Sequence, residues 1–393
     1  MSTLPGDERE DHRALFRLDP AVVHLNHGSF GACPTEILEA QSELRARLER
    51  NAMQFFLRDL EGLLDGVRES LGAFLGAKPE DLAFVNNATT AVNAVLRSLP
   101  FAPGDELLTT DHAYAACKNA IDFVAERTGA RVVVADVPIP LAGPDEAVEA
   151  VVSRATARTK LAMVDHVTSQ TATVMPIDRI VAALDARGID TLVDGAHAPG
   201  MVPLHLDETR AAYTTGNCHK WLCAPKGSAY LHVRADRQGL VRPLTISHGA
   251  RIDRADRSRF ALEFDWPGTW DPTPVLVIPA CLALLERAWP GGLVGLRERN
   301  RALALRARAA LLARVGGEAL VPESMIGSIA SVELSEDLPG FGDPHLEVHR
   351  VAPHIEVPVF RWRSRRLLRV SAQLYNRWPD YEALLRELPE RRA

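Results

Sequence analysis

The 393-residue chain has no run of about 18 consecutive apolar residues, which excludes an ordinary membrane-spanning helix. It has only five cysteines, odd in number and widely spaced, so we expect no disulfide framework. The formal net charge is −6, and the one arginine-rich stretch, residues 361–369, is interleaved with apolar residues, so nothing indicates nucleic acid binding. The first fifteen residues are polar and acidic, unlike a signal peptide, and we expect a cytoplasmic protein.

Lysine is also scarce, since arginine makes up forty of the 45 Lys and Arg residues. One of the five lysines, Lys220, lies between a histidine and a tryptophan, 26 residues after Asp194, which ends the apolar run TLVD. This pattern, with a carboxylate at a strand end and a lysine one supersecondary unit later, is typical of a site for pyridoxal 5′-phosphate (PLP). The lysine would form the Schiff base, and the carboxylate would keep the pyridine nitrogen protonated. The alternative for Lys220 is a solvated loop lysine.

From about residue 60 to 235, helical patterns alternate with short apolar strands. This alternation predicts an α/β fold with a mostly parallel sheet between helices, and the later sequence predicts a smaller α+β domain. We expect an N-terminal arm (1–17), a large cofactor-binding domain (18–272, with 18–50 able to pack on the small domain) and a small domain (273–393). Residues 246–271 have no period and predict a long loop, and 344–350 predict a helix.

In such sheets ligands bind at the carboxyl ends of the strands, where several polar residues fall. Ala88, Thr89 and Thr90 begin a helix directly after the strand LAFV, an arrangement suited to a phosphate, although an ordinary N-cap would look the same. Asn217 and His219 flank the lysine and could add donors to that phosphate.

Other residues are candidates for the ring and the substrate. His197 could lie beside Asp194 or the ring, Ser169 could donate to the phenolic oxygen, and Tyr114 could stack on the ring face. Their alternatives are a turn histidine, a loop serine and a helix-packing tyrosine. Arg369 lies in the apolar strand LLRVS and needs a partner there, for which a substrate carboxylate has the right geometry.

Taken in order, the motifs resemble those of a known family. They are HLNHGSFGACP (24–34), AMQFFLRDL (52–60), NNATTAVN (86–93), DHAY (111–114), DHVTS (165–169), DGAHAPG (194–200), TGNCHKWLCAPKG (215–227), PGTWDP (267–272), IEVPV (355–359) and LRVSAQLYN (368–376). The chain resembles fold-type I PLP enzymes of the class V aminotransferase superfamily, most closely the isopenicillin N epimerase-like branch. The resemblance covers nearly the whole chain from His24 onward.

The resemblance implies a role for each matching residue. Lys220 would be the Schiff-base lysine and Asp194 the partner of the pyridine nitrogen, with His197 and Tyr114 at the ring. The phosphate would be held by Thr89, Asn217 and His219, and by Thr269 from the second subunit of a homodimer. Arg369 would bind the substrate carboxylate, and Asn26, His27 and Ser29 would close over the substrate.

The expected function is chemistry at the α-carbon of an amino acid or an amino-acid-derived substrate, most closely epimerisation or racemisation in secondary metabolism. The alternatives are a C–S or other β/γ-elimination lyase or cyclase, an aminotransferase, or an inactive scaffold on the same fold. Residues 326–369 contain no cysteine, which argues against persulfide-based desulfuration. No G-x-G-x-x-G supports a dehydrogenase, and no second pair at zinc spacing accompanies Cys218 and Cys223, so no metal is predicted.

Overall fold

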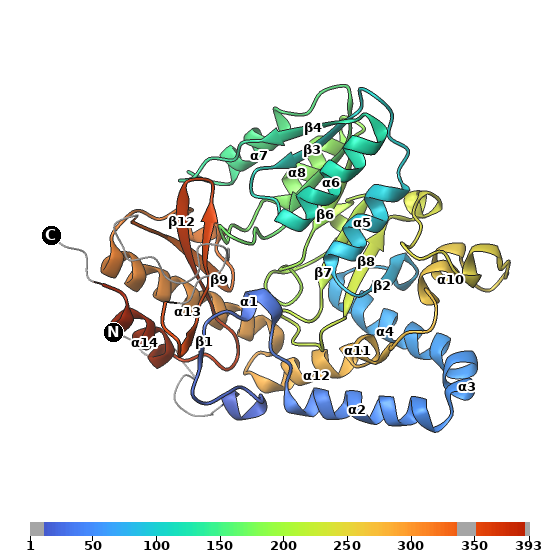
Figure 1. Ribbon diagram of the computed structural model, residues 1–393, viewed down its shortest axis with the longest axis horizontal. Helices are drawn as coiled ribbons and strands as arrows, with labels where there is room; N and C mark the ends of the chain where they lie inside the picture. The colour runs from blue at the N-terminus through green and yellow to red at the C-terminus, as the bar shows by residue number, and fades with distance from the viewer. Residues whose placement is uncertain (1–11, 336–350, 390–393) are drawn as a thin grey trace.

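The computed structural model describes residues 12–335 and 351–389 (Figure 1). The helix predicted at 344–350 and most of the predicted N-terminal arm lie outside the described residues. Within those residues no single helix is long and apolar enough to cross a membrane. One pair, Thr273–Ala288 with Gly292–Val315, meets the length and composition requirements together but is bent by 70°.

A seven-stranded sheet forms the centre of the large domain, in the order β2-β8-β7-β6-β5-β3-β4. Its strands are β2 (Leu82–Val85), β3 (Glu106–Thr110), β4 (Arg131–Ala135), β5 (Thr159–Asp165), β6 (Asp190–Asp194), β7 (Tyr213–Asn217) and β8 (Ala229–Val233). β3 to β7 run parallel to one another, whereas β8 is antiparallel to both β2 and β7. The predicted mostly parallel α/β sheet is confirmed.

Helices cover both faces of this sheet, and nearly every position of its inner strands is therefore buried (Figure 1). One face packs against α5 (Ala88–Ser98), α6 (Ala115–Thr128) and α10 (Arg259–Asp265). The other face packs against α4 (Leu60–Leu75), α7 (Pro144–Val152) and α8 (Ile177–Asp185), and α9 (Leu206–Thr209) lies at the edge of that layer. Successive residues of β5 and β6 therefore point to different helical layers.

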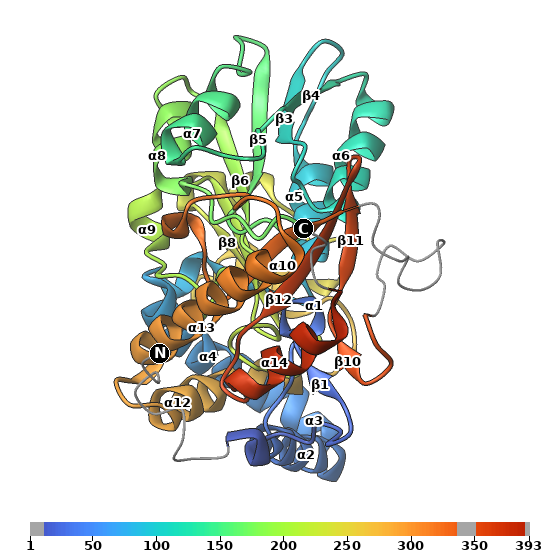
Figure 2. The same cartoon turned by 90° about the vertical axis from the view of Figure 1, so that its left-hand side faces the viewer.

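The small domain has an antiparallel sheet in the order β11-β12-β9, packed on a long helix (Figure 2). The strands are β9 (Ile329–Leu334), β11 (Val359–Trp362) and β12 (Arg365–Ser371), and the helices are α13 (Gly292–Val315) and α14 (Trp378–Glu387). β1 (Val23–His24) pairs in parallel with β10 (Ile355–Glu356), which joins the N-terminal segment to this domain. The exact domain boundaries remain predictions.

The remaining helices connect these layers. They are α1 (His27–Phe30), α2 (Thr35–Arg50), α3 (Ala52–Gln54), α11 (Thr273–Leu276) and α12 (Ile278–Ala288), with a π-helical turn at Phe55–Asp59 between α3 and α4. In Figure 1, α1 lies between the two domains, next to the ends of the central strands. A segment far upstream in the sequence thus reaches the middle of the molecule.

The loop predicted at residues 246–271 is wrong in part, because it contains the helix α10. Ser258 caps that helix by accepting a hydrogen bond from the backbone N–H of Ala261. Phe260 and Phe264 are buried against the large sheet. Seven residues are too few to show a clear helical period, so the burial of two aromatic rings, not the local pattern, determines the helix.

Candidate active site

The loop that carries Lys220 follows β7 and is held by the N-terminal segment. His27 donates through Nε2 to the carbonyl oxygen of Lys220, at 2.8 Å, while its Nδ1 lies 3.1 Å from the hydroxyl of Tyr375. Gly31 has a φ of +72°, and a Cβ added there would lie 2.0 Å from the carbonyl oxygen of His219. Only glycine permits this close approach, which fixes the lysine loop against α1.

The amine of Lys220 lies in a buried setting that favours its neutral form. Burial first, and then the charge of Arg369, lowers the pKa of Lys220 to about 7. Its Nζ is 3.0 Å from Nε2 of His197, whose Nδ1 accepts a hydrogen bond from the indole N–H of Trp221 at 3.4 Å. That indole selects the His197 tautomer with its proton on Nε2, which donates to the lone pair of the Lys220 amine. Burial also keeps the pKa of His197 well below its ordinary value.

Asp194 ends β6 on the sheet face that is covered by α6, and its side chain is buried. One carboxylate oxygen accepts the backbone N–H of Ala196 at 3.0 Å, and the other accepts the thiol of Cys117 at 3.1 Å. Two donors orient the carboxylate without neutralising it. The group is therefore suited to a protonated ring nitrogen.

The start of α5 has free donors at only some of the predicted positions. The backbone N–H of Ala88 donates to Oδ1 of Asn217 at 2.9 Å, which leaves the Asn217 amide to donate outward. The N–H and hydroxyl of Thr90 both donate to the capping side chain of Asn87, at 2.8 and 3.1 Å. Of the predicted phosphate-binding residues on α5, Thr89 has the available hydroxyl, since no hydrogen bond of that hydroxyl occurs in the described chain.

His219 lies beside this helix start in its neutral form. Its Nδ1 donates to the carbonyl oxygen of Ser228 at 3.1 Å, and burial first, then the charge of Lys220, lowers its pKa to about 4. Its Nε2 therefore donates only when the ring is protonated, which a phosphate dianion would favour.

A cavity of about 480 Å³ adjoins this end of the site and is lined in part by Asn87, His219 and Trp270. Thr269 is exposed next to Trp270, in the loop that borders the cavity. The position is open to a second chain.

Arg369 lies on β12 and brings together the predicted substrate-binding residues. Its guanidinium donates to the carbonyl oxygen of Ser169 at 2.6 Å, to the Ser169 hydroxyl at 3.3 Å, and to Asn26 and Ser29 at 3.2 Å each. All four acceptors are neutral, and the guanidinium lies 4.9 Å from the Phe360 ring. Within the described residues no carboxylate pairs with it, although the side chain is almost fully buried and its Nε has no hydrogen bond. Burial lowers its pKa to about 10, so it keeps its charge at neutral pH.

The surroundings of Tyr114 and His27 bear on the roles predicted for them. Tyr114, the residue before α6, is 46% exposed, so its ring is open to a ligand. His27 is buried between Trp221 and Tyr375, and burial lowers its pKa to about 3. Its hydrogen bonds support the lysine loop, whereas Asn26 and Ser29 contact Arg369 directly.

Three residues of the site were not predicted as site residues from the sequence: Asp165, Cys117 and Trp221. Asp165 ends the apolar strand KLAMVD as Asp194 ends TLVD, so the same pattern could have identified it. Cys117 gives no sequence signal, because its role comes from the packing of α6 over Asp194. Trp221 stood out only as the neighbour of Lys220.

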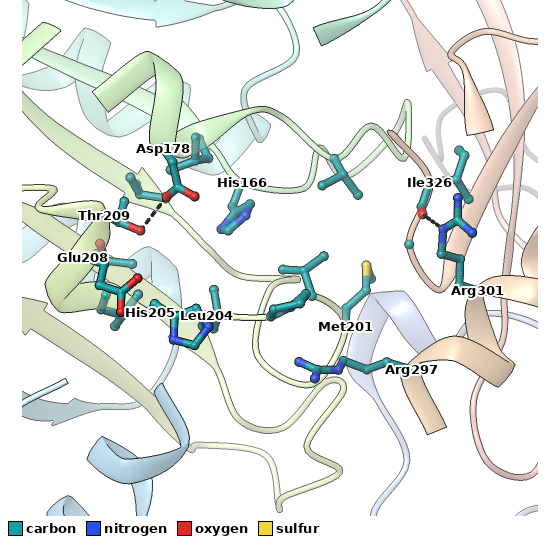
Figure 3. A pocket seen from close by; sticks show the side chains of 18 of the residues that line it. His166, Asp178, Met201, Leu204, His205, Glu208, Thr209, Arg297, Arg301 and Ile326 are labelled. Atoms are coloured by element: carbon teal, nitrogen blue, oxygen red, sulfur yellow. Dashed lines mark hydrogen bonds between the residues drawn. The ribbon is translucent and has the colours of Figure 1, made fainter. Parts of the chain in front are cut away.

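A second cavity of about 590 Å³ is lined in part by Asn26 and His27, whereas a third lies away from the site. This third cavity, of about 760 Å³, lies on the opposite sheet face, between α8, α9 and α13, with His166 and Arg297 directed into it (Figure 3). In the described residues one group, Asp81, Asp207 and His232, could hold a metal ion, and none of the predicted site residues belongs to it.

The residues present fit PLP. The buried amine of Lys220, with its pKa lowered to about 7, matches the aldehyde of PLP. The oriented carboxylate of Asp194 matches the pyridine nitrogen, and the helix start with the free hydroxyl of Thr89 matches the phosphate. The fold and the site therefore define a PLP-dependent enzyme of fold type I. The predicted cofactor is confirmed by the comparisons that follow.

The model of the class-V aminotransferase family matches residues 33–287, and the chain belongs to that family. It is 36% identical to the isopenicillin N epimerase of Amycolatopsis lactamdurans, covering 96% of this chain and 97% of that protein. The probable L-cysteine desulfhydrase of Arabidopsis thaliana is 29% identical, over 93% of this chain and 82% of that protein.

Solved structures show the same fold. The cysteine desulfurase CsdA of Escherichia coli superposes with a TM-score of 0.78 at 21% identity, covering 95% of this chain and 96% of that one. The cystine C–S lyase C-DES, in complex with cysteine persulfide, superposes with a TM-score of 0.79 at 20% identity, over 93% and 96% of the two chains.

Proposed function

We propose that the enzyme epimerises or racemises the α-carbon of an amino acid or an amino-acid-derived substrate. The observation that carries the proposal is Arg369, a buried guanidinium with neutral acceptors only. A buried cation of this kind requires an anionic partner, and a substrate α-carboxylate provides one with bidentate geometry. The identity to isopenicillin N epimerases, 36% and 32%, supports inversion as the outcome.

When bound, PLP supplies an electron sink for the charge that develops at the α-carbon. Arg369 would bind the substrate carboxylate through Nε, which has no partner in the described chain, and through Nη2, which donates to Asn26 and Ser29 in the absence of substrate. Ser169 would hold the guanidinium at Nη1. That arrangement restricts rotation of the substrate about its carboxylate and presents one Cα–H bond to Lys220.

Lys220 would take the α-proton at Nζ, because burial lowers the pKa of its amine to about 7 and so makes a substantial unprotonated fraction available near neutral pH. His197, 3.0 Å away, is neutral and would orient this amine without adding charge. Inversion also needs a proton returned to the opposite face, and we propose the Tyr114 phenol as its donor. The 46% exposure of Tyr114 and its electrostatic interaction with Arg369 support that role.

Elimination of a β- or γ-substituent is the second candidate. Relatives described as L-cysteine desulfhydrases, at 29% identity over 93% of this chain, favour it. The same base and the same carboxylate site would serve, and only the departure of the side-chain substituent differs. A persulfide route is not favoured, because all five cysteines are buried and none lies in residues 326–369.

We further infer a homodimer with shared sites, in the cytoplasm. Exposed Thr269 beside the cavity at the phosphate end supports a contribution from a second chain. Exposed apolar side chains, among them Met53, Leu57 and Ile246, are more than half exposed in one chain and suit burial in a dimer.

The test uses single enantiomers of isopenicillin N and of common amino acids in D₂O. We expect loss of optical purity together with one solvent deuteron at the α-carbon, and neither change with Lys220→Ala. Release of sulfide or a keto acid without inversion would replace epimerisation by elimination. Deuterium exchange without either product would contradict both reactions.

A further inference from the structure

Two buried carboxyl groups end neighbouring strands of the central sheet. Asp165 ends β5 and Asp194 ends β6, and the two residues are register partners. Their side chains are 3% and 2% exposed. Leu161 and Met163, which share the side of β5 on which Asp165 lies, pack with α6. Both carboxyl groups therefore lie under α6, on the side of the sheet from which Cys117 contacts Asp194.

The two groups differ in their hydrogen-bond donors. Asp194 receives the N–H of Ala196 and the thiol of Cys117. Asp165 receives the backbone N–H of Tyr114, and its Oδ1 is buried without a hydrogen-bond partner in the described chain. The other charged group that faces both is Lys220, and none of its nitrogen–carboxylate distances is within 4.0 Å in the described residues.

We propose that Asp165 is a neutral carboxylic acid at neutral pH, so that the pair has one negative charge, carried by Asp194. Two adjacent buried carboxylates repel each other, and donors favour the ionised form of the group that receives more of them. Asp194 receives two donors from the protein and would also hold the protonated pyridine nitrogen of PLP. Burial and the charge of Asp194 together raise the pKa of Asp165 well above its ordinary value.

A neutral Asp165 is a positioning residue for the base. An ionised Asp165 would add a second negative charge near Lys220 and would stabilise the ammonium form of that amine, which cannot accept a proton. Asp165 also fixes the N–H of Tyr114, at the start of the helix that carries Cys117. This part of the argument rests on the proposed use of Lys220 as a base.

Infrared spectroscopy of the full-length, PLP-loaded protein tests the assignment directly. The wild-type minus Asp165→Asn difference spectrum at neutral pH should contain the C=O stretch of one protonated carboxylic acid. The matched variant Asp122→Asn removes an exposed carboxylate of α6 and should remove only carboxylate bands. A neutral-pH difference spectrum with carboxylate bands alone for Asp165→Asn would overturn the proposal.

Thermal unfolding at several pH values gives a second readout. In the unfolded chain Asp165 ionises near pH ~3.9, so wild-type protein loses stability relative to Asp165→Asn as the pH rises above that value. The variant, which mimics the protonated acid, should therefore melt at a higher temperature at pH 8 than wild type. The difference in melting temperature between the variant and wild type should decrease toward pH 4. A variant less stable than wild type at every pH would contradict the assignment.

If Asp165→Asn does not fold, titration of the wild-type carboxylic-acid band remains decisive. The band should persist through neutral pH and disappear only in alkaline solution, and its absence at pH 7 would refute a neutral Asp165. Neither measurement involves turnover, so failure of the epimerase proposal would leave these results unchanged.

Discussion

The substitution Arg369→Lys tests the substrate-carboxylate site most sharply. Lysine keeps the positive charge but loses the planar fork that donates to Ser169, Asn26 and Ser29 and that would bind a carboxylate in bidentate fashion. Because the charge is kept, the cost is that of one lost hydrogen bond to a charged carboxylate, about 1.5–3 kcal/mol. Since each ~1.4 kcal/mol is tenfold, kcat/KM should fall by about 10- to 150-fold.

The measurement is steady-state kinetics with the substrate identified in the D₂O experiment, together with the visible spectrum of the bound cofactor. The spectrum should remain near that of wild type, since the proposed partner of Arg369 is the substrate and not PLP. Arg361→Lys, at an exposed position on the neighbouring strand β11, is the matched control and should behave like wild type. A kcat/KM for Arg369→Lys within about threefold of wild type would refute a carboxylate role for this arginine.

Three further predictions concern the cofactor end of the site. The rate at which PLP-free protein takes up PLP should rise with pH around a midpoint near 7, not near 10.5, because the unprotonated amine of Lys220 would attack the aldehyde. Stopped-flow absorbance measures this rate, and a rise continuing past pH 9 would contradict the lowered pKa. Gly31→Ala should lower the melting temperature and PLP affinity far more than Gly104→Ala, since both glycines have positive φ but only Gly31 has a backbone oxygen within 2.0 Å of the added Cβ. Equal effects of the two substitutions on melting temperature and PLP affinity would mean that the lysine loop shifts at little cost in free energy. Thr269→Ala should weaken PLP binding by about tenfold or more, since a hydrogen bond to a charged group contributes ~1.5–3 kcal/mol. Co-expression of this variant with Lys220→Ala chains should restore turnover, because each mixed dimer would have one intact site. No restoration would argue against a shared site.

The sequence predicted the parts of the site whose signal is local. Asp194 was identified because it ends the apolar run TLVD, and Lys220 because lysine is scarce and this one lies one supersecondary unit later. Arg369 was identified because a charged residue is conspicuous in an apolar strand. The mostly parallel sheet followed from the same runs. These features depend on burial patterns that repeat within a few residues.

Contacts between distant segments were not predictable. The Ala88 N–H is used by Asn217, 129 residues away, which leaves Thr89 rather than the whole helix start for the phosphate. The thiol of Cys117 contacts Asp194 only because α6 crosses the sheet at that point. Likewise, α10 forms in a segment without a helical period because its aromatic residues find a sheet face to cover. In each case tertiary packing decided the outcome.

A common physical cause connects the unusual groups of this site. Lys220, His197 and Arg369 are brought together away from water, and burial is the largest cause of the lowered pKa of each. Burying these groups costs free energy, and the described chain places few carboxylates near them to offset that cost. PLP brings a phosphate, and the substrate brings a carboxylate, so each ligand supplies the negative charge that the folded chain leaves out. Binding of either ligand should therefore stabilise the folded state. Under the proposed function, the substrate that binds best is the one whose carboxylate reaches Arg369 while its α-proton faces Lys220.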